Sequence, residues 1–217
     1  MQSSFMKKAF LFVLVAASIF NARATLYTTN WNSGFAHGGI IPDNDFNGWA
    51  DTRSVSTMPA GVIMGLSVDL ELTGGWNGDL YAYLVHDSGF TVLLDRVGAP
   101  GLSYGYGDAG MDVTLVASGT SIHGYGGGNT FSSTPTGIWM TDNTSGSLAS
   151  FLGTSPNGAW SLFIADLSAG GVTTVQNWGL QMDVVAVPEV ETWVAAAVAG
   201  AFGAFWLSRQ LFGQKEI

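Results

Sequence analysis

The chain has 217 residues and a formal net charge of −9, and it contains no cysteine. The absence of cysteine excludes disulfides, thiolate zinc sites and thiol catalysis. The excess of acidic residues repels phosphate backbones and argues against nucleic acid as a partner.

The N-terminal segment 1–24 has the pattern of a secretory signal peptide. Lys7 and Lys8 precede an uncharged apolar run over 9–20, and Ala22 and Ala24 place small residues where a signal peptidase reads them. The run is too short to cross a bilayer core of about 30 Å. We therefore expect export of the chain and cleavage after Ala24.

The predicted domain covers 25–187, which is long enough for one sizeable core. Thirteen acidic residues within it are opposed by Arg53 and Arg96 alone, so the domain carries a net charge of −11. That balance suits divalent cations or simple solubility. The thirty glycines of the chain favour short strands joined by turns over helices.

Apolar and polar residues alternate along several segments of this domain. Every even position over 62–72 is apolar, and shorter runs of the same kind begin at Met111, Trp160 and Trp178. Because Trp160 and Trp178 lie on the apolar side of their runs, we expect both rings in the core.

Two further strands are predicted at 80–85 and 91–97, on either side of a hairpin-sized turn. Gly/Ser/Asn-rich connections separate these strands from the alternating runs. This pattern predicts an all-β fold, an antiparallel β-sandwich or jelly roll.

The order of several short blocks is also characteristic. The blocks are Ile41-Pro42-Asp43-Asn44-Asp45, Gly78-Asp79-Leu80, Gly158-Ala159-Trp160-Ser161-Leu162 with Asp166, and Trp178-Gly179-Leu180. In this order they resemble the P/Homo B domain, the β-jelly-roll module attached to proprotein convertases and many bacterial exported proteins. The resemblance covers about 40–185 and implies a jelly roll. The stretch before Gly78 and the turn over 86–90 depart from the family's pattern.

The C-terminal tail, 188–217, has its own resemblance. Val187, Pro188 and Glu189, followed by an apolar run over 193–207 and Arg209, resemble the PEP-CTERM sorting signal of Gram-negative bacteria. Val190 replaces the proline that ends the family's motif. The resemblance implies a hydrophobic membrane helix, processing by an exosortase-type enzyme, and a location at the cell envelope, cell surface or extracellular matrix. Acidic residues before the run and basic residues after it agree with a domain outside the cytoplasm.

One segment has the D-x-D-x-N-G pattern of a calcium loop. Asp43, Asp45 and Asn47 supply the alternating oxygens, and Asp51 falls at the ninth loop position. The twelfth position is Ser54 and lacks the usual bidentate glutamate. We predict calcium as a cofactor here, and the alternative is an Asx-rich turn before the first strand.

Catalytic patterns are sparse. The three histidines, His37, His86 and His123, lie in Gly- or Asp-bearing loops, and the sequence has neither a G-x-S-x-G elbow nor an H-E-x-x-H motif. Asp79 and Asp166 flank strands beside glycine-bearing turns, where we expect them to accept backbone N–H bonds.

We therefore predict a non-enzymatic structural or adhesive module, with a hydrolase as the least favoured reading. The alternative function is carbohydrate binding to extracellular polysaccharide, because aromatic rings in loops can stack on sugars. These rings could equally be rim residues of the core. The residues considered for stacking are Trp31, Trp49, Trp76, Tyr104, Tyr106 and Tyr125.

Overall fold

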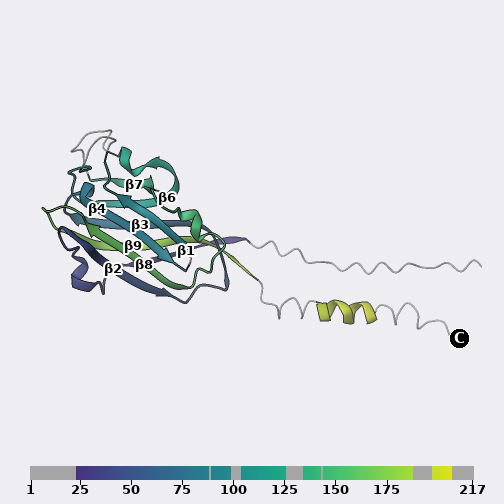
Figure 1. Ribbon diagram of the computed structural model, residues 1–217. Coiled ribbons are helices and arrows are strands. Elements are labelled where there is room, and N and C mark those ends of the chain that lie inside the picture. The colour runs from purple at the N-terminus through teal and green to yellow at the C-terminus, as the bar shows by residue number, and fades with distance from the viewer. Residues whose placement is uncertain are drawn as a thin grey trace, which may run out of the picture. The chain divides into compact units, whose positions relative to one another are not determined.

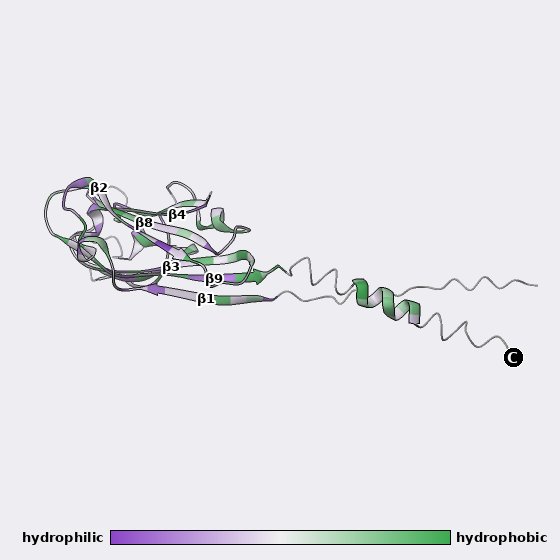
Figure 2. Ribbon diagram, turned by 90° about the horizontal axis from the view of Figure 1, so that it is seen from below, coloured by the Kyte–Doolittle hydropathy of each residue, from purple (hydrophilic) through white to green (hydrophobic). Residues whose placement is uncertain are grey.

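Two β-sheets face each other across a shared core (Figures 1 and 2). The computed structural model describes residues 23–87, 89–98, 104–125, 134–142, 144–187 and 197–206. Both sheets belong to the unit Ala22–Val187, and Met1–Asn21 with Pro188–Ile217 make up the other unit of the chain.

The first sheet has the strand order β1-β9-β3-β6-β7 and the second has β2-β8-β4-β5. All neighbouring strands are antiparallel except β6 and β7, which are parallel. The strands are β1 (Ala24–Trp31), β2 (Asp45–Val55), β3 (Gly61–Gly74), β4 (Leu80–His86), β5 (Gly89–Asp95), β6 (Met111–Ser121), β7 (Thr136–Met140), β8 (Gly158–Asp166) and β9 (Thr173–Ala186). Short 3-10 turns lie between some of them: η1 (Ala36–Gly39), η2 (Asn77–Asp79), η3 (Ile122–Gly124) and η4 (Leu148–Phe151).

The predicted all-β sandwich is confirmed. Each alternating run of the sequence is a strand (β3, β6, β8 and β9), and the predicted hairpin is β4 paired with β5. Three strands, β1, β2 and β7, were not predicted. The sequence predicts a calcium loop at the D-x-D-x-N-G pattern, with a turn before the first strand as the alternative, and β2 begins inside this segment, at Asp45.

One predicted orientation is wrong, and a β-bulge explains it. Strict alternation over 62–72 would bury Met64, but Met64 is 57% exposed while Ile63 is fully buried. The pairing of β3 with β9 shifts register between Ile63 and Gly65. Because a bulge inserts one extra residue, it reverses the facing of every side chain on one side of it.

Trp160 and Trp178 are both fully buried, as the sequence predicts. Trp178 lies on β9 of the first sheet, and its indole Nε1 donates a hydrogen bond of 2.7 Å to Oδ2 of Asp51 on β2 of the second sheet. Arg53 Nε donates to the same oxygen at 2.6 Å. A buried polar bond therefore links the two sheets through the core.

The predicted C-terminal helix lies only in part within the described residues. Positions 197–206 are helical. No helix in the described ranges has both the length and the hydrophobicity needed to cross a bilayer. The predicted signal peptide up to Ala22, and Pro188 and Glu189 of the sorting motif, lie outside the described residues, whereas Val187 is described and exposed.

Replacement of the bridging indole tests the link between the sheets. Trp178→Phe keeps most of the ring but removes the donor to Asp51, and leaving a buried acceptor with one partner fewer costs about 1–3 kcal/mol. We expect a lower melting temperature in thermal unfolding of the full chain. Trp31→Phe is the control for lost ring area, since Trp31 packs on Trp178 at 4.3 Å from a partly exposed position. An equal loss in both variants would contradict the role of the hydrogen bond.

Candidate functional site

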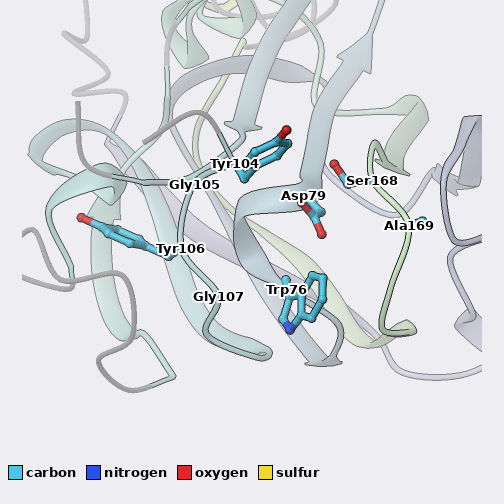
Figure 3. A pocket seen from close by; sticks show the side chains of 8 residues that line it. All are labelled: Trp76, Asp79, Tyr104, Gly105, Tyr106, Gly107, Ser168 and Ala169. Carbon is cyan, nitrogen blue, oxygen red and sulfur yellow. The ribbon is translucent and has the colours of Figure 1, made fainter. Parts of the chain in front are cut away.

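A pocket of about 440 Å³ opens among the loops at one end of the sandwich (Figure 3). Asp79 lies between the rings of Trp76 and Tyr104 in this view. Trp76 is 45% exposed and Tyr104 is 74% exposed, whereas Asp79 is 3% exposed. The pocket thus presents two open aromatic rings around a nearly buried carboxylate. Its full lining is Trp76, Asp79, Tyr104, Gly105, Tyr106, Gly107, Ser168 and Ala169.

Close backbone contact between two loops builds the pocket. A Cβ placed on Gly78 would lie 2.2 Å from the carbonyl oxygen of Tyr104, and Gly105 adopts a φ of 68° against the Cα of Gly78. The N–H of Gly78 donates to the carbonyl of Tyr106 at 2.8 Å. Only glycine permits this approach, so the glycine of the Gly78-Asp79-Leu80 block brings Trp76 and Tyr104 to one site.

The buried floor of the pocket is formed by Asp79, which lies next to Arg96. Asp79 Oδ1 lies 3.8 Å from Nη1 of Arg96, whose Nη2 donates to the carbonyl of Leu167 and to Oγ of Ser168. Burial is the main cause that raises the pKa of Asp79, and the Ser168 hydroxyl and Arg96 oppose it. Oδ2 of Asp79 has no hydrogen-bond partner among the described protein atoms.

Asp166 lies beside this floor, because it ends β8 and pairs with Leu80 at the start of β4. Its Oδ1 accepts the N–H of Ser168 at 3.2 Å, which is the turn bond expected from the sequence. Burial, and then the charges of Asp79 and Asp43, raise its pKa to about 6. The two aspartates of the family-like blocks, far apart in sequence, are therefore neighbours.

The structure divides the predicted stacking residues into three groups. Trp76 and Tyr104 are exposed at the pocket. Trp49 and Tyr106 are 3% and 1% exposed and belong to the core, so the expectation that they stack on a ligand is wrong. Their polar ends are satisfied internally, since Trp49 Nε1 donates to Ala36 and the Tyr106 hydroxyl donates to His123.

The remaining two predicted stacking residues are rim residues of the core. Trp31 packs on Trp178, and Tyr125 packs edge-on against Tyr106 at 4.7 Å. Both are partly buried. Burial is the main cause that raises the pKa of Tyr125, so this phenol stays protonated. Neither ring presents a free face comparable to that of Trp76.

The predicted calcium ligands do not converge. Asp45 Oδ1 accepts the N–H and the Nδ2 of Asn47, each at 2.9 Å, which forms an Asx turn. Asp43 Oδ1 accepts the N–H of Gly170, and Asp51 is used by Trp178 and Arg53.

In the part of the chain that the structure describes, no three His, Asp or Glu side chains form a group that could hold a metal ion. Calcium stays a prediction for the loop that contains Asp43 and Asp45. Equal melting temperatures in ~1 mM calcium and in chelator would overturn it.

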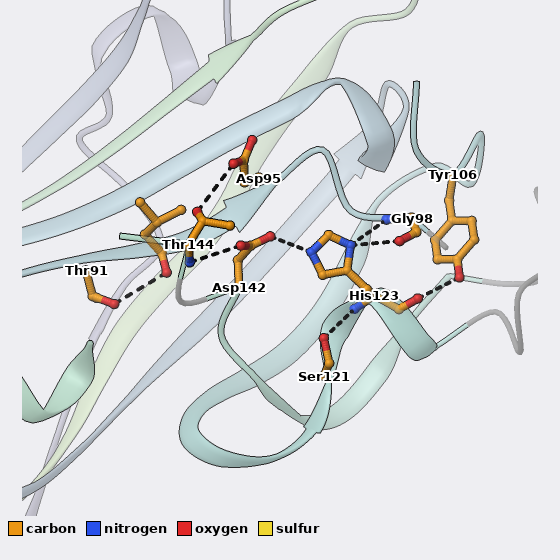
Figure 4. A network of polar contacts seen from close by, with 9 residues as sticks. Thr91, Asp95, Gly98, Tyr106, Ser121, His123, Asp142 and Thr144 are labelled. Atoms are coloured by element: carbon orange, nitrogen blue, oxygen red, sulfur yellow. Dashed lines mark hydrogen bonds and ion pairs between the residues drawn. The ribbon is translucent and has the colours of Figure 1, made fainter. Parts of the chain in front are cut away.

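His123 holds three loops together (Figure 4). Its Nε2 bonds Oδ2 of Asp142, and its Nδ1 lies 2.8 Å from the carbonyl oxygen of Gly98. The hydrogen bond to Asp142 is the main cause that raises the pKa of His123. Both ring nitrogens are engaged within the fold, and the hydrogen bonds tie the segments that carry Gly98 and Asp142 to His123.

The other two histidines differ in exposure. The ring of His86 is stacked on Trp160 at 3.9 Å, and its two nitrogens face the carbonyl oxygens of Ala159 and Ser155. His37 is exposed in η1. The ring nitrogens of His86 are therefore used within the fold.

Some features of the site were not predicted from the sequence. Arg96 and Ser168, which hold the pocket floor, carried no recognisable pattern. An aromatic row on the four-stranded sheet was also missed: Tyr83 stacks on Phe163 at 4.6 Å and contacts Phe90 at 5.4 Å and Tyr81 at 6.2 Å. Alternation within β4 places Tyr81 and Tyr83 on the same face.

The raised pKa of Asp166 predicts a pH-dependent stability. Because the folded-state pKa, about 6, exceeds the ordinary value of 3.8, protonation stabilises the fold, and this stability is lost as pH rises from about 4 through 6. Asp166→Asn mimics the protonated acid. Its free energy of unfolding relative to wild type, followed by thermal unfolding at each pH, is expected to rise between pH 4.5 and pH 8 by an amount on the order of 2 kcal/mol. Asp183→Asn, an exposed position on β9, is the control for loss of one carboxylate. A pH-independent difference for Asp166→Asn would contradict the prediction.

No family model matches the chain, and no curated protein matches it. Two crystal structures of the serine protease of Aeromonas sobria are similar to it over part of their length. The complex of that protease with a chaperone gives a TM-score of 0.46 at 13% identity over 76% of this chain, and the protease gives 0.45 at 14% over 73%. In both cases this chain spans 27% of the length of the other. Similarities this distant support no inference about activity.

Proposed function

We propose that the chain is an exported, non-enzymatic adhesive module of the cell envelope or extracellular matrix of a Gram-negative bacterium. In this proposal a signal peptide exports it, a PEP-CTERM-like tail with a hydrophobic helix sorts or anchors it, and the β-sandwich is a jelly roll of P/Homo B type. The sandwich binds extracellular polysaccharide at the end-loop pocket.

The observation that carries the binding part of the proposal is the placement of two open aromatic rings around one carboxylate. Trp76 and Tyr104 come from different loops, and both expose their rings at the pocket beside Asp79. Exposed aromatic rings provide apolar faces for stacking, and a carboxylate accepts hydrogen bonds from hydroxyl groups. This combination suits the alternating apolar faces and hydroxyl edges of a sugar.

The jelly-roll assignment is supported by the way the family-like blocks meet. Leu80 of the Gly78-Asp79-Leu80 block pairs with Asp166, and Trp178 of the last block bonds Asp51, which follows the first block. Segments separated by many residues are thus joined through strand pairing and core contacts. A surface adhesin without disulfides depends on such contacts for its stability.

The non-enzymatic part of the proposal is supported by the histidines. The ring nitrogens of His86 and His123 face carbonyl or carboxylate oxygens of the fold. A histidine that acts as a general base needs a ring nitrogen free to accept a proton from substrate or nucleophile. These two histidines are therefore built into the framework.

Truncation of the aromatic rings tests the binding site. We expect Trp76→Ala and Tyr104→Ala each to weaken binding to a soluble extracellular polysaccharide about tenfold, because each removes one stacking face. Binding is measured by calorimetry with the full chain in a polyoxyethylene detergent, which has no sugar headgroup to compete. Ile138→Ala, which removes a 70% exposed apolar side chain from β7, is the control. If binding is unchanged in both variants, the pocket is not the binding site. If the protein binds no member of a broad glycan panel, the proposed function is wrong.

A further inference from the structure

The end-loop pocket has one carboxylate on its floor and a second one beside it. Asp79 lines the pocket and its Oδ2 has no hydrogen-bond partner among the described protein atoms, while the carboxylate of Asp43 is bonded to Gly170, which lies against Trp76. One guanidinium, that of Arg96, opposes them. The two carboxylates, Asp43 and Asp79, thus outnumber the one guanidinium at this end of the sandwich.

Asp43 places a second carboxylate next to the segment that packs on Trp76. It is exposed, and its Oδ1 accepts the N–H of Gly170 at 2.9 Å. Gly170 lies against the ring of Trp76, so close that a Cβ there would come within 3.0 Å of the indole. A ligand stacked on Trp76 is thus near an exposed carboxylate as well as the buried one.

The positive charge of Arg96 lies too deep to neutralise the exposed carboxylate of Asp43. Its Nη2 is held by the carbonyl of Leu167 and the hydroxyl of Ser168, and its side chain lies mostly below the surface. Arg53 is the other basic residue of the domain, and it is paired with Asp51. An anionic polymer would meet a domain with a net charge of −11 and is disfavoured.

Aromatic rings add to the attraction for a cation. The face of an indole or phenol ring carries the negative end of its quadrupole and attracts ammonium groups within about 6 Å of its centre. Trp76 and Tyr104 expose such rings next to the carboxylates. A ligand with both an apolar ring face and a positive charge satisfies the whole pocket.

We propose that the ligand of this pocket is a polysaccharide whose sugar rings carry free, protonated amino groups. The inference rests on the proposed function and specifies its substrate class. The sugar ring stacks on Trp76, and its ammonium group lies toward Asp43 and Asp79. Neutral or N-acetylated sugars retain the stacking contact and lose the charged one.

The test compares two matched oligosaccharides on the full chain in the same detergent. The hexamer of β-1,4-linked glucosamine is expected to bind about tenfold more tightly than the hexamer of N-acetylglucosamine near pH 6, and the advantage should shrink as salt screens the charges. Asp43→Asn should remove most of the advantage without changing binding of the N-acetylated hexamer. The control variant is Asp87→Asn, which removes the same charge from an exposed turn at the far end of β4. It should leave the tighter binding of the glucosamine hexamer unchanged.

The possible outcomes separate this inference from the function it rests on. Equal binding of the two hexamers, abolished by Trp76→Ala, would overturn the amino-sugar preference and leave the adhesive function standing. If the protein binds neither hexamer nor any other glycan, both the amino-sugar preference and the adhesive function are overturned. Binding of hexalysine as tight as that of the glucosamine hexamer would show that charge alone is recognised, and would overturn the sugar assignment.

Discussion

The hydrogen bond from Trp178 to Asp51 is the constraint on which the rest of the structure depends. It joins β9 of one sheet to β2 of the other, and both side chains are buried. A buried carboxylate is tolerated only when it is paired, so any sliding of one sheet over the other would leave Asp51 with Arg53 as its partner and the indole N–H with none. The bond therefore fixes how the sheets stack. Since no cysteine is present to cross-link them, this specificity has to come from such contacts together with the apolar core.

A fixed sandwich positions the loops at its end. η2 follows β3 and leads into β4, and the contact between Gly78 and Gly105 holds it against the loop that carries Tyr104. Asp79 ends η2 directly before β4, and Asp166 ends β8, so the pairing of Leu80 with Asp166 brings the two carboxylates together. Anchoring these loops to paired strands limits their movement. Such anchoring would lower the ordering cost of the proposed ligand binding.

Local patterns in the sequence predicted much of the fold, and the errors have identifiable physical causes. Runs that alternate apolar and polar residues predicted β3, β6, β8 and β9, because each of these strands buries one face. β2 was missed because its start coincides with a D-x-D-x-N-G pattern, and the parallel strand β7 was missed because it has only 5 residues and no alternation of buried and exposed positions. Trp49 and Tyr106 lie among glycines and polar residues, which are typical of exposed loops, yet they fold over the core. Trp76 and Tyr104 were predicted as stacking residues from the same evidence. Their convergence on Asp79 depends on tertiary contact, which no local pattern reports.

The proposed function requires that this domain works outside the cell that makes it. The intact mass of the protein, measured separately in membrane, surface and medium fractions of its native cells, decides whether it does. The account predicts a species that begins at Thr25 and ends near Pro188, recovered from the surface or the medium. A species that starts at Thr25 but retains the tail in the membrane would keep export and replace sorting by anchoring. A full-length species of 217 residues confined to the cytoplasm would contradict the account.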